Sequence, residues 1–209
     1  MLTGRRFVIL TLLVFCTGCD TGKTSNSTPR AAFDAFKGAL LEKDFPRAFD
    51  QFTPDTQPLV LGLLAFCDGI EAENDPVCSE QLKKATEKYH LTMYSFVYES
   101  HGTEADHRKI WNKAVESVKD KPGLFAELLQ VIENTSQSKD RSVAKQFGNA
   151  ELRDVQQSGD TATGILNTTW DGQPRSIKIG FERVNGNWLI DAYVTRREGW
   201  AVNIVPKLD

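Results

Sequence analysis

The sequence lacks the residue patterns on which most catalytic and metal centres depend. It contains only three histidines, His90, His101 and His107, and their spacing matches neither a pair of metal ligands on one helix nor a zinc-protease motif. A Gly-x-Ser-x-Gly nucleophile turn and a phosphate-binding glycine loop are also absent. We therefore predict no metal, no cofactor and no catalytic residue, and we interpret the histidines as surface residues.

An excess of positive charge is missing as well. The 209 residues include 25 Lys and Arg against 28 Asp and Glu, a net charge of −3. Proteins that bind nucleic acid usually carry a basic patch or stripe. The composition therefore excludes nucleic acid as an expected partner.

No apolar run is long enough to cross a bilayer, which needs about 20 residues. The run Phe7 to Phe15 is broken only by Thr11 and follows the basic pair Arg5-Arg6. This pattern predicts a secretory signal peptide over residues 1–18. The most apolar internal stretch, Pro58 to Phe66, predicts a short buried helix.

The end of this signal, Cys16-Thr17-Gly18-Cys19, resembles the lipobox of bacterial lipoproteins, with Cys16 where an aliphatic residue is usual. The resemblance implies a diacylglyceryl thioether on Cys19, and hence an exported protein of the bacterial cell envelope whose partner is a membrane. Asp20 resembles the inner-membrane retention signal of enteric bacteria, but the choice of membrane stays open. The alternative is a plain secretory signal that leaves the protein free in the periplasm. The polar residues that follow predict a flexible tether, so that 19–28 would be lipidated cysteine and tether.

Two cysteines, Cys67 and Cys78, remain in the mature chain. Disulfides are common in exported proteins, and we predict one between these residues, closing a loop from Asp68 to Val77. The alternative is a pair of buried thiols.

Three strand-like runs near the end of the chain predict an antiparallel meander. They are Thr161 to Trp170, Arg175 to Val184 and Asn187 to Thr195. Asn185-Gly186 between the last two is the preferred centre of a two-residue hairpin. A two-residue hairpin and a four-residue loop at Asp171 to Pro174 predict these neighbours: Phe181 with Ile190, Ile179 with Ala192, Ile177 with Val194, Leu166 with Ile179, and Asp191 with Gly180 on the opposite face.

The residues before the meander predict helices. Thr28-Pro29 is typical of a helix start, and Phe33 and Phe36 follow at helical spacing. The expected fold class is α+β, with N-terminal helices and a helical insert packed on a C-terminal curved antiparallel sheet. We expect one domain over residues 29–200, with the insert at 59–140, the meander at 149–195 and a tail at 201–209.

Two stretches resemble the nuclear transport factor 2-like superfamily, whose members fold as a cystatin-like cone. They are Pro29 to Phe52, with its Lys-Asp-Phe and Thr-Pro-Asp runs, and Gly159 to Ala162 followed by Phe181 to Asp191. The resemblance implies a cone whose inner sheet face could line a pocket, in a superfamily that includes isomerases and many non-catalytic binding domains. The predicted inner face holds no titratable side chain.

The candidate pocket residues are Phe33, Phe36, Leu166, Ile179, Phe181 and Ile190, although such a stripe is also typical of simple core. We expect a non-catalytic, membrane-anchored domain that binds a small apolar ligand or an envelope protein. One alternative is an isomerase-like or hydratase-like enzyme with acid and base groups on the helical insert, and another is a purely structural lipoprotein.

Overall fold

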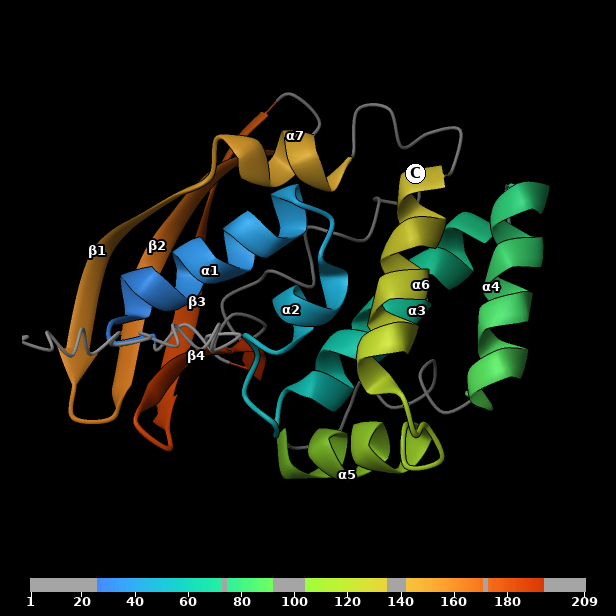
Figure 1. Ribbon diagram of the computed structural model, residues 1–209, viewed down its shortest axis with the longest axis horizontal. Coiled ribbons are helices and arrows are strands. Elements are labelled where there is room, and N and C mark those ends of the chain that lie inside the picture. The colour runs from blue at the N-terminus through green and yellow to red at the C-terminus, as the bar shows by residue number, and fades with distance from the viewer. Residues whose placement is uncertain (1–25, 73–74, 92–103, 135–141, 171–172, 194–209) are drawn as a thin grey trace, which may run out of the picture.

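The computed structural model describes residues 26–72, 75–91, 104–134, 142–170 and 173–193. Within these ranges the protein has an α+β fold, with helices first and a curved antiparallel sheet last (Figure 1). The helices are α1 (Pro29–Leu41), α2 (Phe45–Phe49), α3 (Gln57–Ala72), α4 (Pro76–Tyr89), α5 (Glu104–Ala114), α6 (Lys121–Asn134) and α7 (Val143–Gly148). The strands are β1 (Glu151–Ser158), β2 (Thr161–Trp170), β3 (Gln173–Val184) and β4 (Asn187–Asp191). The predicted fold class is confirmed.

The first helix begins where the sequence predicts. The hydroxyl of Thr28 accepts a 3.1 Å hydrogen bond from the amide of Ala31, and Pro29 occupies the first helical position. Thr28 thereby satisfies an amide that has no partner within the helix. Proline sacrifices no helical hydrogen bond at the first position, because an amide there would have no acceptor in the helix. In Figure 1, α1 crosses one face of the sheet, with α7 beside it.

The segment between the two internal cysteines is more helical than expected. Helix α3 continues to Ala72 and α4 begins at Pro76, so the prediction of a loop from Asp68 to Val77 is wrong for most of that range. Asp75 explains the early start of α4, because its carboxylate accepts hydrogen bonds from the amides of Val77 and Cys78. The other helices of the insert, α5 and α6, complete the layer on the right of Figure 1. Among the described residues, no helix combines the length and apolarity that crossing a bilayer requires.

The sheet has the order β1-β2-β3-β4, with every neighbouring pair antiparallel. Two predicted pairs are confirmed, Phe181 with Ile190 and Gly180 with Asp191. The predicted pairing of Leu166 with Ile179 is wrong by two residues, because Leu166 pairs with Ile177. The ladder continues to Trp170 and Gln173, so fewer residues connect β2 to β3 than expected. A shift of two residues keeps each side chain on its predicted face.

The last strand is shorter than predicted. It ends at Asp191, whose carboxylate accepts a 2.9 Å hydrogen bond from the amide of Tyr193 and turns the chain away from the sheet. Ala192 therefore lies beyond the strand, and the expected pair of Ile179 with Ala192 does not form. The expected pair of Ile177 with Val194 lies outside the described residues.

Candidate functional site

The predicted pocket residues come together in one buried cluster. Phe33 and Phe36 project from α1, and the other four belong to β2, β3 and β4. All six are buried, with exposed fractions between 1% and 6%, in one hydrophobic core that also includes residues of α2, α3 and α6. The six residues are Phe33, Phe36, Leu166, Ile179, Phe181 and Ile190.

Aromatic side chains connect the helices within this core. The ring of Phe36 lies 5.2 Å from that of Phe52 and 5.5 Å from that of Phe147, both edge to face. The rings of Phe49 and Phe125 lie 5.1 Å apart. Such ring pairs stabilise a fold by more than the burial of their apolar area alone would. Phe36 of α1 therefore takes part in the aromatic packing of this core.

The core contains no charged group among the residues that the structure describes. The buried polar side chains there are all uncharged: Asn26, Gln51, Thr53, Thr56 and Gln146. Asp191, which the register predicted to face away from the core, is half-buried. General acid or base chemistry would need a titratable group at the reacting atoms, and the titratable side chains in the described part of this core are those of Tyr89 and Tyr193.

The helical insert does bring titratable groups together, between α4 and α6. The ammonium of Lys88 contacts the Glu127 carboxylate, and the Tyr89 hydroxyl donates to the same oxygen at 3.3 Å. The hydrogen bond from Lys88 to Glu127 raises the pKa of Lys88, and burial raises the pKa of Tyr89. A lysine or a tyrosine needs a lowered pKa to act as a general base near neutral pH. These shifts act in the other direction, so the geometry supports an ion pair that joins two helices.

The remaining sequence candidates are dispersed. His90 is exposed and ends α4 in a left-handed conformation, while His101 lies outside the described residues and the side chain of His107 is not described. No cluster of three or more His, Cys, Asp or Glu that could hold a metal occurs in the described ranges. Cys19 lies outside the described residues, so its lipidation stays a prediction.

The predicted disulfide is not tested by the structure. Cys78 is buried in the first turn of α4, and the side chain of Cys67 on α3 is not described. The two helices do pack against each other.

A cluster of polar groups that the sequence did not predict closes the outer edge of β4. The Trp188 amide donates to the carbonyl of Asn26 at 2.9 Å, and the Ile190 amide donates to the carbonyl of Gln51 at 2.8 Å. In return the Ile190 carbonyl accepts from the Thr53 amide at 3.0 Å. We call Asn26 together with Gln51 to Thr53 the edge clamp. Its members belong to the start of the domain and to the loop after α2.

Asn26 is the least expected member of the edge clamp. Its side-chain amide donates to the carbonyl of Trp188 at 3.1 Å and to the side chain of Gln51 at 2.7 Å, and it is 5% exposed. The sequence placed it in the flexible tether, because a single asparagine among Ser, Thr and Lys carries no signal of burial. The folded domain thus begins at least three residues before the expected residue 29.

Comparison with known proteins adds no relative. The sequence matches no family model and no curated protein, and the structure matches no solved structure.

Proposed function

We propose that this protein is a lipid-anchored, non-catalytic domain of the bacterial cell envelope that binds a protein partner on its outer surface. The proposed fold type is the nuclear transport factor 2-like cone, on the resemblance of the two stretches described above. The lipobox-like Cys16 to Cys19 supports the anchor. One observation carries the choice of partner: the residues that should line an apolar pocket pack against one another in the core. A small apolar ligand would have to displace them.

Native mass spectrometry of the mature, lipidated protein, released from detergent, tests whether the interior holds a small molecule. The wild-type protein should carry no small molecule beyond its covalent lipid, even with added benzene as a probe. The control is Phe36→Ala, which removes a ring from the core and leaves an apolar cavity of the kind that binds benzene. A noncovalent mass on the wild-type protein that is lost on denaturation would overturn the choice of partner and favour a small ligand.

The anchor and the partner have separate readouts. Intact mass should show the lipid on Cys19 and lose it in Cys19→Ala. Crosslinking in intact cells should join the wild-type protein reproducibly to one envelope protein, and much less when Cys19→Ala removes the anchor. Crosslinks that form only between copies of this protein would instead favour a structural lipoprotein.

A further inference from the structure

We infer that the end of the sheet that carries both hairpin turns faces the phospholipid headgroups, and that α4, which lies beyond the reach of the tether, is not held at the membrane. This inference rests on the proposed lipid anchor at Cys19. We call the turns at residues 158–161 and 184–187, together with Asn26, the hairpin end. Its place relative to the membrane follows from how Asn26 is held.

The hydrogen bonds of Asn26 fix where the tether leaves the domain. Its carbonyl and its side-chain amide both bond to the main chain of Trp188, and the side-chain amide also bonds to Gln51. Freeing Asn26 would leave buried polar groups without partners, which costs about 1–3 kcal/mol for each group. The attachment point is therefore part of the folded domain.

The remaining tether is short. Only Asp20 to Ser25 separate Cys19 from Asn26, and even a fully extended chain spans at most about 24 Å over that distance. A folded domain of this size is about 40 Å across. The tether can therefore bring the surface around Asn26 to the bilayer but cannot reach around the domain to its far end.

Both hairpin turns lie beside Asn26. The Asp160 carbonyl in the first turn accepts a 2.7 Å hydrogen bond from the Arg183 amide, and Arg183 pairs with Trp188. Trp188 in turn bonds to Asn26. Neighbouring strands lie about 4.8 Å apart, so Asp160 is only about three strand spacings from the attachment point. The second turn, at Asn185 and Gly186, directly precedes β4.

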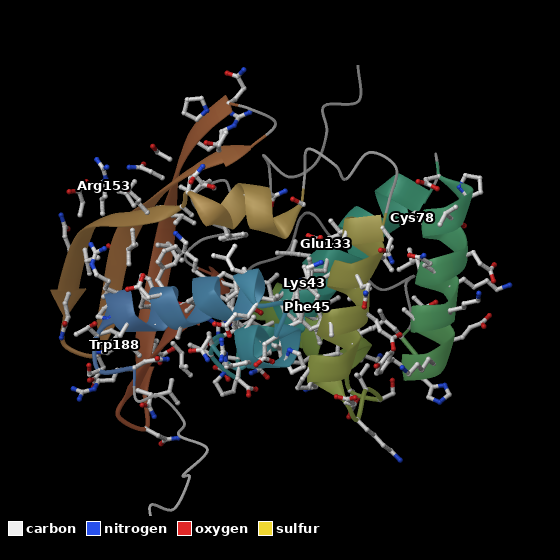
Figure 2. The ribbon with its side chains drawn as sticks, turned by 45° about the horizontal axis from the view of Figure 1, so that its top comes forward. Lys43, Phe45, Cys78, Glu133, Arg153 and Trp188 are labelled. Carbon is white, nitrogen blue, oxygen red and sulfur yellow. The ribbon has the colours of Figure 1, made fainter. Side chains whose placement is uncertain are left out.

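Helix α4 lies away from the sheet along the long axis of the molecule. Figure 1 shows the strands and α4 at opposite ends of the long axis. Figure 2 shows the same separation for two labelled side chains, Trp188 in the sheet and Cys78 on α4. Helix α4 therefore lies beyond the reach of the tether and remains available for a partner in the aqueous compartment.

The chemistry of the hairpin end suits headgroups rather than hydrocarbon. Its exposed residues are mostly small, polar or glycine, among them Ser158, Gly159, Thr161, Asn185 and Gly186. Asp160 adds one negative charge, and the exposed Glu182 and Arg183 beside the hairpin end add one charge of each sign. Such a surface can exchange hydrogen bonds with headgroups, whereas burial in the acyl layer would leave its polar groups unsatisfied. We therefore expect contact with the membrane surface and no insertion.

Photocrosslinking in vesicles tests the orientation. The mature lipidated protein is reconstituted in phosphatidylethanolamine–phosphatidylglycerol vesicles with p-benzoylphenylalanine replacing either Asp160 or Glu87, both of which are exposed. Lipid adducts, counted by mass spectrometry, should be several-fold more frequent at position 160. Equal adducts at the two positions, or more at 87, would overturn the inference.

A longer tether provides the matched control. Inserting about twenty Gly and Ser residues between Ser25 and Asn26 gives a flexible linker, and the difference between the two positions should shrink towards none. Intact mass is measured before irradiation. If Cys19 carries no lipid, the proposed anchor fails and the orientation fails with it. If the lipid is present but position 160 gains no excess of adducts, the orientation alone is wrong.

Discussion

The main-chain amide of Trp188 donates a 2.9 Å hydrogen bond to the carbonyl of Asn26, joining residues 162 positions apart in the sequence. An exposed strand edge offers unpaired amides and carbonyls to other chains and so favours aggregation. Here the first described residue and the loop after α2 occupy the edge of β4. The same contact that protects the sheet also fixes where the tether begins.

Replacing Asn26 should weaken the fold. In Asn26→Ala the carbonyl of Trp188 and the side chain of Gln51 each lose a buried partner. We expect the free energy of unfolding, measured in urea, to fall by about 1–3 kcal/mol. Ser27→Ala changes the exposed neighbouring residue, and the free energy of unfolding of this variant should stay within about 0.5 kcal/mol of the wild-type value. Equal losses in both variants would show that the side chain of Asn26 contributes nothing specific.

The sequence was sufficient to predict the elements whose signals are local. The cap at Thr28, the Asn185-Gly186 hairpin and the alternation of Ile177, Ile179 and Phe181 each specify their own structure over a few residues. The resulting inner face of the sheet is the one observed. Whether that face lines a pocket or a core depends on the helices above it, and contacts such as those of Phe52 with Phe36 and Phe125 join residues too far apart for a local pattern to pair them.

The failures have two causes, a contact made elsewhere in the chain and a turn of undetermined length. Asn26 is buried only because β4 presents free edge groups to it. The loop composition of 171–174 did not fix how many of its residues leave the sheet, and Pro174 joined the ladder at a position that β4 does not cover. Proline is tolerated at such edge positions because it lacks an amide hydrogen.

Stability should fall at high pH through Tyr89. Burial and the nearby Glu127 and Asp120 raise the pKa of Tyr89, with the hydrogen bond to Lys88 opposing them. Because the folded pKa exceeds the unfolded value of about 10, the neutral phenol contributes stability that is complete below pH 10 and is lost as pH rises through the folded pKa.

Urea unfolding between about pH 9 and pH 11 measures this loss around the ordinary tyrosine pKa. Tyr89→Phe keeps the ring but cannot ionise, so its stability should decline less steeply over that interval. If the free energy of unfolding fell equally with pH in the wild type and in Tyr89→Phe, Tyr89 would be excluded as the titrating group.

The predicted disulfide should appear when the protein is exported to an oxidising compartment. In denatured protein, the Cys67 and Cys78 thiols should then react with an alkylating reagent only after reduction. Cys67→Ser should lower the free energy of unfolding by about 3 kcal/mol, the chain-entropy value for a short loop, and the difference from wild type should vanish in reducing buffer. Alkylation of unreduced wild-type protein at both cysteines would favour two buried thiols.

Two glycines should respond to alanine in opposite directions, because one lies against the bulge in β1 and the other in open space. The register between β1 and β2 shifts between Arg153 and Gln156, with Asp154 in a left-handed conformation. Gly164 lies opposite this bulge. A Cβ there would meet Leu152 Cδ1 at 2.7 Å and the Arg153 carbonyl oxygen at 3.2 Å.

Gly38 lies inside α1, and a Cβ there would meet nothing within 4 Å. Gly164→Ala forces the side chain of Leu152 or the bulge to move, and overpacking of this kind costs about 1–3 kcal/mol. Gly38→Ala removes the backbone entropy of a glycine within a helix and should stabilise the protein by about 0.5–1 kcal/mol. Urea unfolding of both variants and of the wild type shows whether each substitution lowers or raises the free energy of unfolding. Stabilisation by Gly164→Ala would show that the sheet can relax around the added methyl group, and the close packing of β1 on β2 would then not explain the glycine.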